Sequence, residues 1–173
     1  MKTSISVLFA AIASLAAAQA GHTNGPPDEM KSLSFLEGNW TGKQNFNNPT
    51  GPMVGQLKVT VHSFAAGRFI EELSSTTLPG RKPTEVHHFI SYDPATKTFH
   101  AWWFNDTSNK PMELEGALTG NQLVLQNHPT NPNAPVLRAT YDKVSDKAIN
   151  YKLEMKQADD KWLELFHNNI SKS

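Results

Sequence analysis

The sequence predicts an all-β protein: an antiparallel up-and-down barrel of about ten strands, with a short N-terminal helix plugging its base. Two observations lead to this fold class. Apolar and polar residues alternate in many short runs, as at Ile149, Tyr151, Leu153 and Met155, and a period of two is typical of a strand with one buried face. Tight turns and long loops then alternate along the chain, as they do in a meander whose strands reverse direction at every connection.

The alternating runs number ten, and each is bounded by turn residues. They span 40–46, 55–64, 68–76, 84–92, 98–105, 112–119, 122–126, 136–144, 148–156 and 161–168. The second, fourth, sixth and eighth connections are tight, whereas the first, third, fifth and seventh are longer and rich in Pro. We therefore expect a closed base with tight turns and an open rim with long loops, a segregation that a sandwich would not require.

One helical stretch precedes the first strand. Asp28 lies at its start, Met30, Leu33 and Leu36 give it an apolar stripe, and Gly38 ends it. Because it leads into the first strand from the base end, we expect it to close the base of the barrel.

Composition excludes several classes of protein. The chain has 173 residues, with 16 basic residues balancing 16 acidic ones and no cysteine. The absence of a basic surplus disfavours nucleic-acid or anionic-membrane binding, and the absence of cysteine excludes disulfides and zinc–thiolate sites. No phosphate-binding loop, nucleophile motif or metal-ligand spacing occurs, so no cofactor and no metal site are expected.

The N-terminus has the pattern of a secretory signal peptide. Lys2 precedes an apolar run at 7–18 that is too short to span a bilayer, and Ala18-Gln19-Ala20 forms a small-x-small cleavage site. We expect cleavage before Gly21 and a secreted or periplasmic protein without a stable membrane anchor. The expected organisation is a signal peptide at 1–20, a polar linker at 21–28 and a barrel domain at 29–173.

Three Asn-x-Ser/Thr triplets follow, at Asn39, Asn105 and Asn169. In a eukaryotic secretory pathway they would be glycan acceptors.

Several motifs carry a resemblance to a known family. Gly38-Asn39-Trp40 resembles the Gly-x-Trp that opens the first strand of lipocalin-like (calycin) barrels, and Leu36 precedes it as in that family. With Gly67-Arg68-Phe69-Ile70-Glu71-Glu72 and the turn Ser91 to Lys97, the chain resembles a mostly bacterial family of lipocalin-like domains of unknown function. The resemblance implies a calycin-type barrel and no established activity.

Two positions depart from that family. Trp103-x-Asn105 stands where the family has Trp-x-Asp, and Ser91 stands where it has Gly. The chain also resembles nitrobindin, a haem-carrying ten-stranded barrel, more distantly and only in its layout and its Gly-x-Trp.

Turn lengths predict which side chains face the interior. A three-residue turn at 65–67 would pair Val61 with Glu71 and place Phe69 and Glu71 inside. A four-residue turn at 157–160 would likewise place Trp162 and Glu164 inside. Two carboxyl groups would then share a largely apolar cavity, where burial disfavours the charged form.

The inward faces of the runs 84–92 and 98–105 stay open. The parity of the family's Trp-x-Asp puts His87, Phe89, Phe99, Trp103 and Asn105 inside, and the other register puts His88, His100 and Trp102 inside. Adjacent His87 and His88 cannot both point inward.

Four functions fit these features. The first is a secreted carrier of a small, mostly apolar ligand, and the candidate ligand-binding residues are Tyr151, Trp103, Asn105, Phe89, Trp162 and Phe69. The second is a cofactor-independent isomerase, cyclase or lyase, and the candidate catalytic residues are Glu71, Glu164 and His87. The third is a haem barrel like nitrobindin, and the fourth is a structural domain with a filled core.

Overall fold

The computed structural model describes residues 25–106 and 108–173. The expected signal peptide at 1–20 and its cleavage site lie outside the described residues. The expected barrel domain, from residue 29 onward, lies almost wholly within them.

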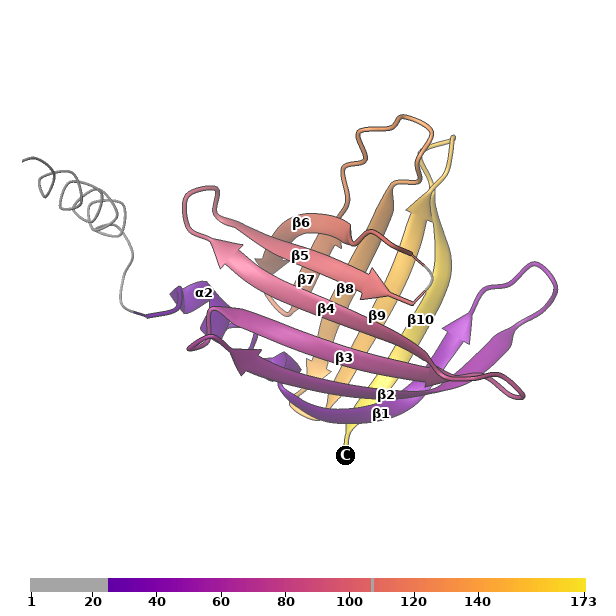
Figure 1. The fold of residues 1–173 in the computed structure, drawn as a ribbon, viewed down its shortest axis with the longest axis horizontal. Coiled ribbons are helices and arrows are strands. Elements are labelled where there is room, and N and C mark those ends of the chain that lie inside the picture. Colours follow the sequence, from indigo (N-terminus) through magenta and orange to yellow (C-terminus); the bar gives the residue numbers. More distant parts are fainter. Residues whose placement is uncertain (1–24, 107) are drawn as a thin grey trace, which may run out of the picture.

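Ten strands close into one antiparallel barrel. Each strand pairs with its sequence neighbours, and β1 pairs with β10 to complete the ring. In Figure 1, β1 to β5 cross in front of β7 to β10. The strands are β1 (Gly38–Phe46), β2 (Met53–Phe64), β3 (Phe69–Thr77), β4 (Thr84–Asp93), β5 (Thr98–Asn105), β6 (Met112–Thr119), β7 (Gln122–Gln126), β8 (Leu137–Ser145), β9 (Ala148–Lys156) and β10 (Trp162–Lys172). The predicted fold class is confirmed.

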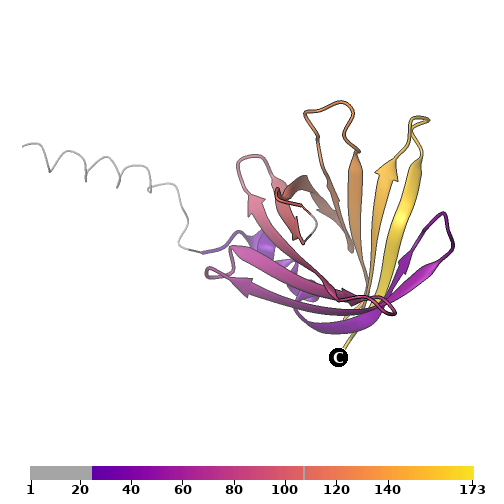
Figure 2. The same cartoon turned by 45° about the vertical axis from the view of Figure 1, so that its right-hand side comes forward.

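Long loops and tight turns lie at opposite ends of this barrel. The connections at 65–68, 94–97, 120–121 and 146–147 are the tight ones. The loops after β1, β7 and β9 stand together at the upper right of Figure 2. The barrel therefore has a base and a rim, as the alternation of connection lengths predicts.

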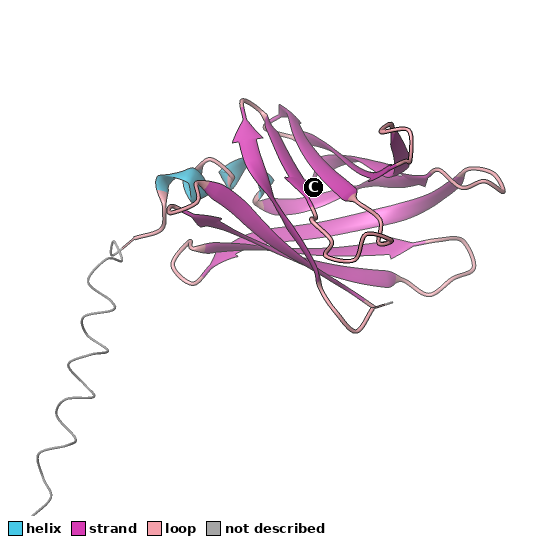
Figure 3. Ribbon diagram, turned by 90° about the horizontal axis from the view of Figure 1, so that it is seen from above, coloured by secondary structure: helices cyan, strands magenta, loops and turns pink. Residues whose placement is uncertain are grey.

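The N-terminal segment closes the base. It forms two short pieces, α2 (Asp28–Lys31) and the 3-10 turn η1 (Ser34–Leu36), where the sequence predicts one helix. Both lie at the end of the barrel that carries the tight turns (Figure 3). Leu33 is fully buried, and the indole of the buried Trp40 donates a 2.8 Å hydrogen bond to the Leu36 carbonyl. This bond ties the first strand to the plug beneath it.

The interior divides into an apolar floor and a polar mouth. Buried apolar side chains fill the half near the base, among them Ile70, Ile90, Phe99, Leu123, Ile149 and Ile170. Buried polar side chains gather toward the rim, among them Gln44, Glu72, Thr76, His88 and Asn168. Because an unpaired buried polar group is unfavourable, this mouth is where a binding site is expected.

Two inward glycines allow neighbouring strands to approach closely. A Cβ on Gly42 would lie 2.1 Å from the Asn169 carbonyl oxygen, and one on Gly116 would lie 1.8 Å from that of Val124. No larger residue fits at either place, so these positions set how closely β1 approaches β10 and β6 approaches β7.

The β2–β3 register differs from the prediction by one residue. The turn spans four residues, 65–68, and its first two residues adopt positive φ angles of 50° and 56°. Val61 therefore pairs with Glu72. The predicted inward position of Glu71 is wrong, because the extra turn residue moves each side chain of β3 to the opposite face.

The sequence leaves the inward faces of β4 and β5 undecided between two registers. The structure follows one of these registers on β5 and the other on β4. Trp103 and Asn105 point inward on β5, as the family parity implies, but His88 rather than His87 points inward on β4. The reason is the four-residue turn at 94–97, which pairs His88 with Trp103.

The last hairpin contains a bulge that sequence alternation does not reveal. Its turn spans 157–161, and the register shifts between Glu164 and Phe166, leaving Leu165 as the extra residue. Phe166 lines the interior. Trp162 and Glu164, on the other side of the bulge, lie on the outer wall, so their predicted inward positions are wrong.

Candidate ligand-binding cavity

A cavity of about 230 Å³ opens at the rim end of the barrel. Its lining comes from β1 to β5, β9, β10 and the loop after β5: Gln44, Phe46, Leu57, Glu72, Ser74, Thr76, Thr84, Val86, His88, Trp103, Asn105, Asp106, Tyr151, Phe166 and Asn168. A second hollow of about 370 Å³ lies on the other side of Trp103 and Asn105, which line both. The end of β5 thus forms a partition between the two spaces.

Glu72, His88 and Tyr141 form a buried polar cluster at the inner end of the cavity. The Tyr141 hydroxyl donates to Glu72 Oε2 at 3.0 Å and lies 2.8 Å from His88 Nδ1. His88 Nδ1 also lies 3.3 Å from Glu72 Oε1. The network therefore joins the neighbouring strands β3 and β4 to β8, which is distant from them in the sequence.

This network fixes the hydrogen on the imidazole. Tyr141 has one hydroxyl hydrogen, and it points to Glu72. The 2.8 Å contact between His88 and Tyr141 must therefore use a hydrogen on Nδ1, a tautomer assigned from its partners. In neutral His88, Nε2 then carries a free lone pair. Glu72 thus contacts Nδ1, while Nε2 borders the cavity.

Both interior tyrosines keep their hydroxyl hydrogens at neutral pH. Burial raises the pKa of Tyr141 well above its usual value of 10, and the nearby Glu72 carboxylate raises it further. Burial and Glu72 raise the pKa of Tyr151 in the same way. Each phenol is thus a hydrogen-bond donor.

Four buried polar atoms have no hydrogen-bond partner within residues 25–106 and 108–173. They are His88 Nε2, Trp103 Nε1, the Tyr151 hydroxyl and Asn168 Oδ1. All four residues line the same cavity. An orphaned buried polar atom calls for water, an ion or a ligand, and here four such atoms border a single space.

Aromatic rings surround this polar set. The Trp103 ring meets the His88 ring edge-on at 4.9 Å, and the Tyr151 ring lies 6.4 Å from it. Tyr151 also packs 4.7 Å from Tyr141 and 5.8 Å from Phe166. The walls are therefore suited to a flat, mostly apolar molecule with a few polar atoms.

Comparison with known families identifies the group of proteins to which the chain is related. The family described as "Protein of unknown function (DUF1579)" matches residues 25–172. The chain belongs to this family. The match covers the whole barrel, in agreement with the resemblance to lipocalin-like domains of unknown function. No curated protein matches the sequence significantly.

Solved structures share the DUF1579 chain's fold at low sequence identity. Rv2717c from M. tuberculosis superposes with a TM-score of 0.66 at 16% identity, over 86% of this chain and 99% of that one. The S-type phycobiliprotein lyase CPES from Guillardia theta gives a TM-score of 0.56 at 7% identity, over 82% of this chain and 90% of that one. These likenesses establish the barrel architecture.

No helix in the described part of this DUF1579 chain is long and apolar enough to cross a membrane. The same residues hold no group of three or more His, Asp or Glu arranged to bind a metal ion.

Three of the predicted ligand-binding residues lie in the cavity. Tyr151, Trp103 and Asn105 all line it. Trp103 and Asn105 come from the end of β5, and Tyr151 comes from β9 across the barrel.

Four of the predicted site residues of the DUF1579 barrel lie on the outer wall of β3 and β4. Glu71 contacts His87 at 3.1 Å and His62 at 3.3 Å there, so its charge is satisfied outside the cavity. Phe69 and Phe89 flank the same outer face. The four-residue turns described above account for all four placements.

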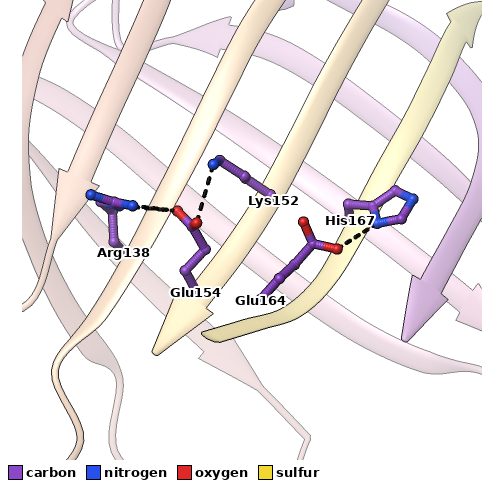
Figure 4. A network of polar contacts seen from close by, with 5 residues as sticks. All are labelled: Arg138, Lys152, Glu154, Glu164 and His167. Carbon is purple, nitrogen blue, oxygen red and sulfur yellow. Dashed lines mark hydrogen bonds and ion pairs between the residues drawn. The ribbon is translucent and has the colours of Figure 1, made fainter. Parts of the chain in front are cut away.

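The remaining two lie on the outer wall of β10, beyond the bulge. Glu164 accepts a 2.7 Å contact from His167 Nδ1, and the pair stands beside the Glu154–Arg138 ion pair in Figure 4. The Arg138 guanidinium stacks 4.0 Å from the centre of the Trp162 ring. These polar groups therefore form an external network.

Sequence reasoning did not select Glu72, His88 and Asn168, which line the cavity, or Tyr141, which contacts Glu72 and His88. His88 was present in the alternative register, and Glu72 is the immediate neighbour of the predicted Glu71. If Ala65-Ala66-Gly67-Arg68 is taken as a four-residue turn, the sequence predicts that Glu72 points inward. No local signal points to Tyr141 or Asn168, because their role depends on contacts across the barrel.

Proposed function

We propose that this barrel is a secreted carrier or sensor that binds one small, mostly apolar molecule in the rim cavity. The observation that carries the proposal is the group of four unpartnered polar atoms around one space. Leaving a buried donor or acceptor without a partner costs about 1–3 kcal/mol each. A ligand that satisfies them recovers this free energy and gains orientation from it.

The size and lining of the cavity define the ligand further. A volume of about 230 Å³ is below the roughly 300–1,000 Å³ of drug-sized pockets. The ligand is therefore a single ring or a short chain, unless it extends past Trp103 into the second hollow. The likeness to the phycobiliprotein lyase is one of fold, so the proposal depends on the cavity itself.

A steric block on one wall tests the proposal. Ser74 lines the cavity, and the adjacent Ser75 points to the opposite face of β3. Native mass spectrometry of protein purified from its own host should show a noncovalent adduct. Ser74→Trp should remove the adduct, and Ser75→Trp should retain it. An adduct that survives in both variants, or wild-type protein that carries none and takes up no added apolar dye, would contradict the proposal.

An acid–base enzyme is the second candidate, favoured by the Glu72–His88 pair. His88 presents Nε2 to the cavity while Glu72 supports Nδ1, which is the geometry of a general base. The candidate catalytic residues of an isomerase, cyclase or lyase are therefore these two residues in place of Glu71, Glu164 and His87. Turnover lost in Glu72→Gln with unchanged ligand affinity would favour it.

A haem barrel is the third candidate, and the cavity does not fit this group. His88 is the one histidine of the described residues that lines the cavity. Its Nε2 is free, but Trp103 stands edge-on against the imidazole at 4.9 Å and closes the space to about 230 Å³. A macrocycle requires that this indole move away. We expect no Soret band after haemin is added.

A further inference from the structure

The hydrogens available in the cavity define which polar group a ligand must carry. Trp103 Nε1 is a donor only, and the Tyr151 hydroxyl keeps its hydrogen because burial raises the pKa of Tyr151. His88 Nε2 is the lone-pair acceptor, since Nδ1 holds the ring hydrogen. Trp103 and Tyr151 therefore offer two donors and His88 one base to the same space, which Asn168 Oδ1 also borders as a second acceptor. The ring centres of Trp103 and Tyr151 lie 4.9 Å and 6.4 Å from that of the imidazole.

A ligand hydroxyl group can hydrogen-bond with Trp103, Tyr151 and His88 at the same time. Its hydrogen goes to His88 Nε2, and its oxygen accepts from Trp103 and Tyr151. An ether or ketone oxygen would leave the base without a donor, and an ammonium group would leave both donors without an acceptor. The aromatic walls of Trp103, Tyr151 and Phe166 favour a flat ring as the carrier of this hydroxyl.

We propose that the cavity binds a small phenol or enol in its ionised form, with the proton transferred to His88 Nε2. The ligand O–H bond breaks and an N–H bond forms, while the electron pair of the broken bond stays on oxygen. The imidazolium then lies between the Glu72 carboxylate and the ligand oxyanion, and net charge is conserved. This inference rests on the proposed ligand-binding function and specifies its ligand class.

The charges around His88 favour the transfer. Glu72 from β3, Tyr141 from β8 and Tyr151 from β9 face it, and Asp106 lies exposed at the mouth. Among the described residues no Lys or Arg lines this cavity. His88 is therefore the one group that can supply a positive charge beside the oxyanion, and a single carboxylate behind it stabilises that charge.

A matched pair of probes tests this inference. 4-Nitrophenol has the ionisable hydroxyl and absorbs visible light only as the phenolate, whereas 4-nitroanisole has a methyl ether in its place. Binding of each is followed by quenching of tryptophan fluorescence, and ionisation by phenolate absorbance at a pH where free 4-nitrophenol is mostly neutral. We expect 4-nitrophenol to bind more tightly, with its ionisation constant raised roughly tenfold or more, a shift of about one pKa unit.

Substitutions on the inner and outer faces of β3 and β4 test which residues cause the ionisation of bound 4-nitrophenol. His88→Gln and Glu72→Gln should each abolish the gain in phenolate absorbance. His87→Gln and Glu71→Gln, on the outer wall, should retain it. If both probes bind equally, or if bound 4-nitrophenol stays neutral, the inference is overturned while the ligand-binding function stands. If neither probe quenches fluorescence, both fall.

Discussion

His88 and Trp103 pair directly across β4 and β5, and their rings meet inside the barrel at 4.9 Å and 89°. Each ring carries a polar nitrogen with no partner among the described residues. The contact places the base next to an indole donor, and it places that indole on the partition between the two hollows. The pair thus controls both the polarity and the size of the cavity.

Replacing the indole with a smaller ring should weaken binding without unfolding the protein. Trp103→Phe keeps an aromatic wall but removes the N–H, so we expect 4-nitrophenol affinity to fall about tenfold, the equivalent of one hydrogen bond of ~1.4 kcal/mol. Trp102→Phe, on the outer face beside it, is the control. Equal loss in both variants would show that the effect is not specific to the cavity.

The two interior tyrosines should respond oppositely to the loss of their hydroxyls. Tyr141→Phe leaves Glu72 and His88 without a shared partner, so we expect the free energy of unfolding to fall by about 1–3 kcal/mol. Tyr151→Phe removes a hydroxyl that has no partner, and it should leave stability unchanged or raise it slightly. Urea unfolding monitored by fluorescence compares them, and a loss of stability in Tyr151→Phe would indicate a partner such as bound water.

Alkaline pH should unfold the protein through these same groups. Burial raises the folded-state pKa of Tyr141 and Tyr151 well above 10. A raised folded pKa contributes stability that is fully present below the unfolded pKa and is lost as pH rises above it. The free energy of unfolding should therefore decline above about pH 10. In a pH titration of phenolate absorbance, Tyr92 should ionise first and the other two only as the barrel unfolds.

The alternation in the sequence was sufficient to predict the barrel but not its inner face. Strand number, closure and the segregation of loops depend on patterns that repeat over the whole chain. The inward side of β3 depends on one residue in one turn, and Ala65 and Ala66 adopt a left-handed conformation that alanine rarely takes. The bulge at Leu165 is similarly hard to predict, because apolar residues flank Glu164 at both parities and give no strict alternation that an extra residue would break.

The cavity was therefore predictable in kind and only partly in its residues. Tyr151 follows from the alternation of its own strand, whereas Trp103 and Asn105 follow from the Trp-x-Asp parity of the resembling family, one of two registers that the sequence leaves open. Tyr141 meets Glu72 over 69 positions of sequence. A contact of that kind is set by how the barrel closes, and no local pattern encodes it.

Secretion is tested at the N-terminus. We expect processed protein to begin at Gly21, because Ala18-Gln19-Ala20 presents small residues at the positions a signal peptidase reads. N-terminal sequencing of material from the culture medium or periplasm decides this. Substituting Ala20 with a bulky residue should block cleavage and retain the precursor, and an extracellular protein that starts at Met1 would contradict the expectation.

The adjacent carboxyl groups Glu71 and Glu72 offer the sharpest test of the register. Glu72 is about one-tenth exposed and bonded to Tyr141 and His88, so Glu72→Gln should lower the free energy of unfolding by about 1–3 kcal/mol. Glu71 is more exposed and faces His62 and His87 on the outer wall, so Glu71→Gln should change it by less than about 1 kcal/mol. If instead Glu71→Gln is the damaging substitution, β3 is displaced by one residue. The cavity would then present Glu71 in place of Glu72, and the assignment of His88 as its base would lose its supporting carboxylate.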